Sequence, residues 1–114
     1  MSVEEHEFCP YYHQAVELIG KRWTGAILRE LLHGRHRFTE LRSAIPGLSD
    51  RLLSERLKEL EREGIVVREV FAEVPVRVEY RLTEKGLALE RAVGAISEWA
   101  EEWLAGRPVT GSRA

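Results

Sequence analysis

The sequence contains a single cysteine in 114 residues, so no disulfide can form within the chain. It contains no apolar run near the roughly 20 residues that a membrane-spanning helix needs, which excludes an integral membrane protein. Residues 1–7 are acidic and hold no apolar segment, so we expect no export and a cytoplasmic location. The composition, 44% hydrophobic with 9 glycines and 4 prolines, is typical of one globular domain whose core needs no disulfide or metal.

The local motifs of common enzyme classes are also missing. There is no G-x-S-x-G, no glycine-rich phosphate loop, no paired zinc motif and no recognisable Ser-His-Asp set. We therefore expect no enzymatic activity and no cofactor. His6, Cys9 and His13 are the one set of side chains that could share a metal, but three ligands near a chain end are a weak basis, and we expect no metal site.

Charge is distributed unevenly, although the net charge is only -2. Residues 21–62 carry ten bases and six acids, which gives +4, whereas residues 1–20 carry four acids and no bases. A basic block between acidic flanks is typical of a protein that binds a polyanion such as nucleic acid. An ordinary solvated surface explains the same excess, so charge alone leaves both interpretations open.

Hydrophobic periodicity predicts four helices in the first half of the chain. Apolar residues recur at helical spacing, with Gly and Pro as stop signals, over residues 9–20, 23–34, 38–46 and 49–63. Ser49 is a good N-cap for the last of these helices. Leu53, Leu57 and Leu60 then form its inward side.

The period changes from 3.6 to 2 after Gly64, which predicts a hairpin over residues 65–82 with its connection at 71–75. Thr83 is the expected cap of one long helix over 83–104, about 33 Å in length. This order predicts a mainly α fold with a small antiparallel β-hairpin. We interpret residues 1–114 as a single winged helix-turn-helix domain, with the helix-turn-helix at about 37–63 and the wing at about 65–82.

The outward face of the helix over 49–63 has the side chains that a recognition helix needs. With the leucines inward, the side chains that point away from the core are Arg51, Glu55, Lys58 and Arg62, and Ser54 lies at the edge of that face. Arginine and lysine read guanine or hold phosphate, and glutamate accepts from cytosine. The alternative is a solvated helix face with Arg51 and Glu55 in i, i+4 register.

Two further segments add candidate contacts to DNA. The basic turn at residues 35–37 precedes a helix start, where backbone N–H groups and cations hold phosphate. Arg77 near the hairpin tip is a candidate for a phosphate or minor-groove contact, or else pairs with a glutamate on the neighbouring strand. The predicted DNA-binding residues are Arg37, Thr39, Ser49, Arg51, Ser54, Glu55, Lys58 and Arg77.

The helix over 83–104 carries an apolar stripe that is too long for a domain of this size to cover. Such a face marks an oligomer interface, and we expect a two-fold dimer to which the first helix contributes. The predicted interface residues are Tyr11, Val93, Ile96, Trp99, Ala100 and Trp103. The alternative is that the helix folds back onto its own core. A dimer would place two recognition helices roughly 34 Å apart and would bind a near-palindromic site on double-stranded DNA.

Short segments along the chain resemble the HxlR-type transcriptional regulators. They are Cys9-Pro10 and residues 18–24 (LIGKRWT), 27–31 (ILREL), 37–41 (RFTEL), 45–49 (IPGLS), 57–61 (LKELE), 73–80 (EVPVRVEY) and 82–86 (LTEKG). The resemblance covers about residues 8–104. It implies a bacterial or archaeal winged-helix homodimer related to the MarR group, with residues 49–63 in the major groove, the 65–82 hairpin as the wing and the outer helices at the dimer interface.

One residue departs from the family pattern, and one occupies a position of interest. Gly25 stands where the family more often has a larger apolar residue, which allows a closer helix approach or leaves room for a ligand. Cys9 occupies a position where members often carry a sensing thiol. It also precedes a helix start that favours a thiolate, although the acids of residues 4–7 oppose this. The alternative is a small buried core residue near the dimer interface.

The leading hypothesis is therefore a homodimeric, sequence-specific DNA-binding transcriptional regulator. By resemblance, repression of transcription is a commoner expectation than activation. A small molecule or an oxidant is the expected effector. The alternative is a winged helix that binds other proteins and not DNA.

Overall fold

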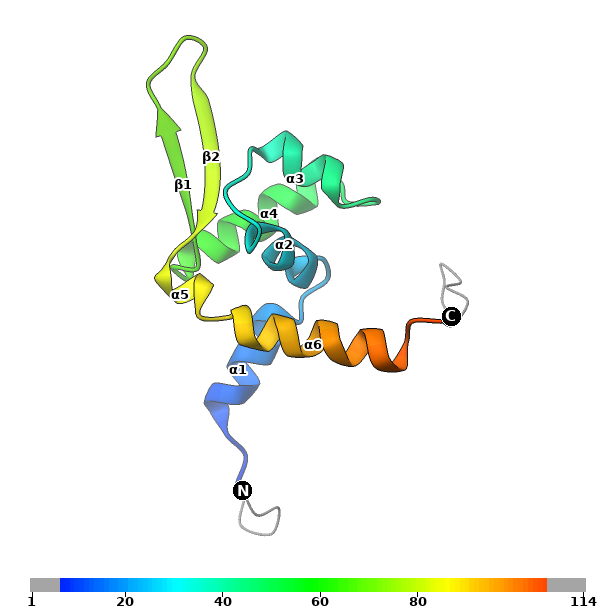
Figure 1. The fold of residues 1–114 in the computed structure, drawn as a ribbon. Coiled ribbons are helices and arrows are strands. Elements are labelled where there is room, and N and C mark those ends of the chain that lie inside the picture. The colour runs from blue at the N-terminus through cyan, green and yellow to red at the C-terminus, as the bar shows by residue number, and fades with distance from the viewer. Residues whose placement is uncertain (1–6, 107–114) are drawn as a thin grey trace.

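The computed structural model describes residues 7–106 and follows the predicted order of elements (Figure 1). The elements are α1 (Pro10–Ile19), α2 (Thr24–Leu31), α3 (Phe38–Ala44), α4 (Asp50–Arg62), β1 (Val66–Phe71), β2 (Arg77–Leu82), α5 (Glu84–Leu87) and α6 (Glu90–Trp103). The fold is a winged helix-turn-helix that is mainly helical with one antiparallel hairpin, as predicted.

The core lies where α2, α3 and α4 meet the base of the hairpin. Leu53, Leu57 and Leu60 of α4 are buried, which confirms the predicted inward side of this helix. The other buried hydrophobic residues come from α2, from α3 and the turn that follows it, and from the hairpin: Ile27, Leu28, Leu31, Leu41, Ile45, Leu48, Ile65, Val66, Tyr80 and Leu82. Burial of this apolar set holds the helix-turn-helix together, and α1 adds only the half-buried Leu18 and Ile19 at its edge.

The hairpin pairs from Val66 opposite Leu82 to Phe71 opposite Arg77. His36 forms an isolated antiparallel β-bridge with Tyr80 of β2. The His36 N–H donates to the Tyr80 carbonyl at 2.9 Å, and the Tyr80 N–H donates to the His36 carbonyl at 2.7 Å. This bridge ties the segment before α3 to the wing. The hairpin projects well beyond the core, as Figure 1 shows.

The prediction of one continuous helix over residues 83–104 is wrong. The chain forms the short helix α5, a turn at Ala88 and Leu89, and then α6. At the turn the Leu89 N–H bonds to the Gly86 carbonyl, three residues back, so the helix tightens and changes direction.

Gly86 accounts for the position of α5. A Cβ at this residue would overlap the carbonyl oxygen of Ile65, so α5 approaches the start of the hairpin as closely as only glycine allows. The Thr83 hydroxyl fixes the same contact by donating to the carbonyl of Gly64. The turn after α5 then directs α6 away from the wing (Figure 1).

The helices at the two ends of the chain lie outside the core. Of the described residues, none in α1 or α6 is buried. None of the helices described is long and apolar enough to cross a membrane.

Candidate nucleic-acid interface

Helix α4 has a defined start and an exposed outer face. The Ser49 hydroxyl accepts from the Leu52 N–H at 3.1 Å and caps the helix, as predicted. Asp50 in the first turn complements the helix dipole and pairs with Arg42 of α3 at 3.1 Å. The Ser49 cap and the exposed Arg42–Asp50 pair lie at the start of α4, next to the turn between the two helices.

The predicted recognition residues of α4 lie on one side of the helix. Arg51, Glu55 and Lys58 are exposed and Ser54 is half-buried. The Arg51 side chain is 89% exposed and pairs with Glu55 at 3.3 Å, which is the i, i+4 register of the alternative interpretation. Lys58 has no ion-pair partner among residues 7–106. The exposed pair between Arg51 and Glu55 is weak, so the charges of both residues are free to contact a ligand.

The start of α3 supplies a second group of exposed side chains. Arg37 and Thr39 are both exposed, as the prediction requires. The Arg37 N–H donates to the Glu40 carboxylate at 2.7 Å, which caps α3. Arg37 and Thr39 therefore lie at the N-terminal end of the first helix of the helix-turn-helix.

The wing carries alternating arginines and glutamates that bind one another. Arg77 pairs with Glu73 at 2.7 Å and with Glu79 at 2.5 Å. Its partners are in the connection and on its own strand, so the alternative prediction of a partner on the neighbouring strand is wrong. The cross-strand pair is instead Arg81 with Glu69, at 3.1 Å.

Arg35 joins this network from outside the hairpin, and the sequence interpretation missed its role. Its guanidinium lies 2.8 Å from the Glu69 carboxylate and 3.3 Å from that of Glu79. The residues are 34 and 44 positions apart, so no local spacing rule could have revealed the contacts. The alternation of charge along β2 was the one available signal.

The ion pairs shift the titration of the wing carboxyls. Hydrogen bonding to Arg81 lowers the pKa of Glu69. Hydrogen bonding to Arg77 lowers the pKa of Glu73 and of Glu79, and these two carboxylates raise the pKa of Arg77. All four groups are therefore charged at neutral pH, and the wing is held by charge-assisted hydrogen bonds.

Cys9 is exposed at the start of α1. Its Sγ accepts a hydrogen bond from the Tyr12 N–H at 3.4 Å, so the sulfur is the N-cap of the helix. The alternative of a buried core cysteine is wrong for the protomer. No group of three His, Cys, Asp or Glu side chains within residues 7–106 is arranged to hold a metal, and His6 lies outside the described residues.

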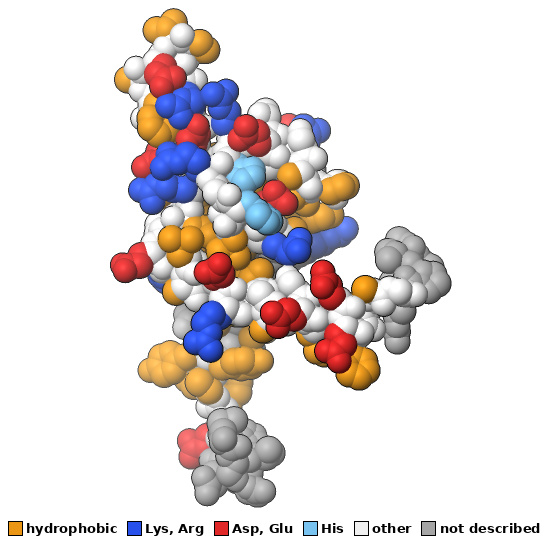
Figure 2. Space-filling view, in the orientation of Figure 1, with side chains coloured by type: hydrophobic (Ala, Val, Ile, Leu, Met, Phe, Trp, Pro, Cys, Tyr) orange, Lys and Arg blue, Asp and Glu red, His pale blue; other side chains and the backbone are white. Residues whose placement is uncertain are grey.

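Large apolar side chains are exposed on both end helices, where Figure 2 shows hydrophobic atoms gathered over α1 and toward the end of α6. On α6, Ile96 is 61% exposed, Trp99 56% and Trp103 60%, whereas Val93 and Ala100 are half-buried. On α1, Tyr11 is exposed. The alternative in which the C-terminal helix covers its apolar stripe with its own core is therefore wrong.

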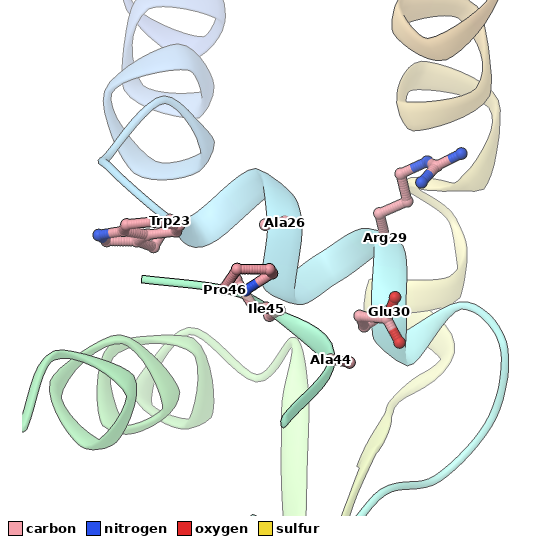
Figure 3. A pocket seen from close by; sticks show the side chains of 7 residues that line it. All are labelled: Trp23, Ala26, Arg29, Glu30, Ala44, Ile45 and Pro46. Carbon is pink, nitrogen blue, oxygen red and sulfur yellow. The ribbon is translucent and has the colours of Figure 1, made fainter. Parts of the chain in front are cut away.

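A shallow cavity of about 320 Å³ lies between α2 and the turn after α3 (Figure 3). Trp23 and Pro46 lie along one side and Glu30 at the other, while Arg29 points toward α6 and donates to Ser97 at 3.2 Å. Gly25 does not line this cavity, and a Cβ added to it would meet nothing within 4 Å. The closer helix approach expected of Gly25 is therefore not found in the described protomer, whereas the space beside it leaves room for a ligand as a prediction.

Known proteins share both the sequence and the fold. The HTH-type transcriptional regulator YvaP of Bacillus subtilis is 52% identical over 102 residues, which are 90% of this chain and 94% of YvaP. The reduced transcriptional regulator YodB of B. subtilis superposes with a TM-score of 0.78 at 43% identity, over 90% of this chain and all of that one. YodB has also been solved after diamide treatment and with quinone bound.

The redox regulator HypR in its oxidised form superposes with a TM-score of 0.80 at 40% identity, over 89% of this chain and 100% of that one. The model of the family described as HxlR-like helix-turn-helix matches residues 18–107. This match spans more than half of the chain and agrees with the winged helix-turn-helix described above. The chain therefore belongs to the HxlR-like helix-turn-helix family, whose relatives here are transcriptional regulators and not enzymes.

Proposed function

We propose that this protein is a homodimeric, sequence-specific DNA-binding repressor with a thiol switch. The observation that carries the proposal is α4, a capped helix with its leucines in the core and Arg51, Ser54 and Lys58 along the opposite side. Helix α4 enters the major groove, where Arg51 and Lys58 contact guanine edges or phosphate and Glu55 accepts from cytosine.

The other predicted contacts position the protein on the duplex. Arg37 and Thr39 at the start of α3, and Ser49 at the start of α4, lie next to phosphates. Arg77 contacts the backbone from the wing while Glu73 and Glu79 hold its guanidinium in place. These contacts set the register, and α4 supplies most of the sequence preference.

A second copy of the chain covers the apolar faces of α1 and α6. Tyr11 on α1 and the stripe of Ile96, Trp99 and Trp103 on α6 are the anchors, supported by Val93 and Ala100. The two-fold axis places the two copies of α4 roughly 34 Å apart, which requires a near-palindromic operator. A bound dimer represses by blocking RNA polymerase at the promoter.

Cys9 makes the dimer responsive to oxidants. Its exposed sulfur faces the amide end of α1, a position that favours the reactive thiolate. Oxidation joins the Cys9 thiol to a second thiol, which is the partner's Cys9 or a small thiol, and the oxidant takes up two electrons and two protons. Since Cys9 lies on α1, the new bond acts at the proposed dimer interface.

The DNA-binding proposal is tested by fluorescence anisotropy across a salt series. The probes are the duplex upstream of the protein's own gene and a scrambled duplex of equal length. We expect tighter binding to the upstream DNA and a steep loss of affinity with salt, with a log-log slope of roughly -0.9 per phosphate contacted. Equal, weak, salt-insensitive binding to both duplexes and to other genomic fragments would contradict the proposal and favour a protein-binding winged helix.

The thiol switch is tested with the same duplex after treatment with diamide and glutathione. We expect the parent to lose roughly tenfold in affinity, a typical allosteric coupling, and to recover it with dithiothreitol. The Cys9→Ser variant should bind as the reduced parent does and should not respond. Mass spectrometry identifies the product as a glutathione adduct or a cross-linked dimer. A Cys9→Ser variant that loses as much affinity as the parent would rule out the switch.

A further inference from the structure

The connection between α1 and α2 touches the helix-turn-helix through three consecutive residues. The Lys21 ammonium lies 3.2 Å from the Glu59 carboxylate of α4. The carbonyl of Arg22 accepts from the Arg56 Nε, also of α4, at 3.0 Å. Trp23 packs on the turn between α3 and α4, where a Cβ at Gly47 would lie 3.3 Å from its ring. One short segment thus reaches both the turn and the second helix.

Arg56 differs from the other cations of α4. Its side chain is 15% exposed, against 89% for Arg51. Besides the bond from Nε, its Nη1 lies 3.2 Å from the Glu59 carboxylate, so Glu59 is shared between Arg56 and Lys21. A charge this far withdrawn from water is costly unless it is paired, and loss of either contact would leave an unsatisfied group. Three partners thus surround the Arg56 guanidinium: the Arg22 carbonyl, Glu59 and, with its carboxylate 4.0 Å from Nη1, Glu55.

Trp23 fixes the direction in which the chain leaves the connection. Its φ of 79° is in the left-handed region, which no other described non-glycine residue adopts. The Arg22 guanidinium lies 5.2 Å from the ring centroid and covers the ring. This backbone conformation fixes the angle between the end of α1 and the start of α2. Its energetic cost is offset by the contacts of the connection with Gly47 and α4.

Helix α1 has few other ties to the protomer. Of its residues in the described chain, Leu18 and Ile19 in the last turn pack against the core, and none is buried. The direction of α1 relative to α4 is therefore set mainly by the connection. In a dimer held by α1 and α6, that direction fixes where the two recognition helices lie.

We propose that Arg56 is a positioning residue for operator recognition, which locks α4 to the α1–α2 connection through the Arg22 carbonyl and Glu59. The inference rests on the proposed homodimer. The lock sets the separation and tilt of the two α4 helices without itself contacting a base. It also gives a shift of α1 a direct route to α4, because Lys21 and Arg22 follow the last turn of α1.

The test measures the distance between the two α4 helices in solution without DNA. The chain has a single cysteine, so a Cys9→Ser, Lys58→Cys protein carries one nitroxide per protomer, and pulsed dipolar spectroscopy reports the separation of the two labels. We expect one narrow distribution. Adding Arg56→Gln should shift or broaden it by roughly 2 Å or more, the size of helix shifts at subunit interfaces. Arg56→Lys, which keeps a charged donor, should restore much of the narrow distribution.

The matched control is Arg62→Gln, the same substitution at an exposed arginine of α4 that has no ion-pair partner among residues 7–106. It should leave the distribution unchanged. Circular dichroism at the measuring temperature must show a folded protein. If Arg56→Gln does not fold, Glu59→Gln replaces it; it removes the shared anion but keeps the Arg22 carbonyl bond, so a smaller shift in the same sense is expected.

The outcomes separate the inference from the function on which it rests. A dipolar signal whose distribution is the same in the parent and in the Arg56 and Glu59 variants overturns the positioning role and leaves the dimer intact. An absence of dipolar signal in the parent overturns the dimer, and the inference with it. A shift in Arg56→Gln that Arg62→Gln matches would also overturn the inference, because it would reflect lost charge on α4 and not the lock.

Discussion

A glutamate in place of Ile96 is expected to separate the proposed dimer into folded monomers. Ile96 is 61% exposed in the protomer and lies on the same side of α6 as Trp99 and Trp103. The two-fold axis would bury the new carboxylate twice in an apolar contact with no cation to pair it, which costs several kcal/mol. Sedimentation should report a protomer of 13.1 kDa for Ile96→Glu and twice that mass for the parent.

The same variant should lose most of its affinity for the operator. A dimer binds the second half-site at a high effective concentration, and its dissociation removes that gain, roughly 100-fold or more. Circular dichroism should be unchanged, because Ile96 is not part of the core. Arg91→Glu is the matched control, since it places the same acid on α6 at an exposed position outside the apolar stripe. A variant that remains dimeric and binds DNA normally would show that α6 does not form the interface.

The second large effect is expected from the double variant Arg51→Ala, Lys58→Ala. Each side chain is exposed on α4, and a good contact to a base edge is worth roughly 1–3 kcal/mol. Together they should lower affinity for the specific duplex by roughly 100-fold or more, with no change in thermal unfolding because neither contributes to the core.

The salt series then distinguishes base contacts from phosphate contacts. Loss of base contacts lowers the affinity for the specific duplex more than that for scrambled DNA. Loss of phosphate contacts weakens both equally and reduces the salt slope by about 1 for each cation. Arg91→Ala removes one cation from α6 and should leave specific binding unchanged. If the double variant binds as the parent does, α4 is not the recognition helix.

The helix-turn-helix and the wing were predictable because short-range chemistry marks their limits. Gly34, Pro46-Gly47 and Gly64 end elements where no other residue type serves as well, and Gly34, Gly47 and Gly64 have positive φ. The spacing of Leu53, Leu57 and Leu60 decides which side of α4 is buried. These signals act within a few residues, and a single sequence contains them.

The break between α5 and α6 could not be predicted in this way. The break follows α5, whose position depends on the approach of Gly86 to the Ile65 carbonyl, a contact between residues far apart in the chain. Within the local sequence, residues 83–104 have the pattern of one amphipathic helix. Tertiary contact at the base of the wing decides the outcome against the local pattern.

In the candidate site, too, local sequence patterns predict some residues and contacts between distant residues determine others. Exposure of Arg51 and Lys58 follows from helical periodicity and agrees with the structure, and Arg37 and Thr39 are exposed as well. The half-buried Arg56 was missed, because its bond to the Arg22 carbonyl joins residues 34 positions apart. Whether each exposed residue contacts DNA stays a prediction that the variants above address.

The paired charges of the wing bear on how the protein would search a chromosome. Arg35, Arg77 and Arg81 are matched by Glu69, Glu73 and Glu79, so this face of the wing carries no net charge. Attraction to DNA of any sequence depends on net positive charge, and the wing adds little to it. Because the projecting wing binds the phosphates of random DNA weakly, the protein would dissociate from wrong sites quickly. Most of its time on DNA would then be spent at the operator.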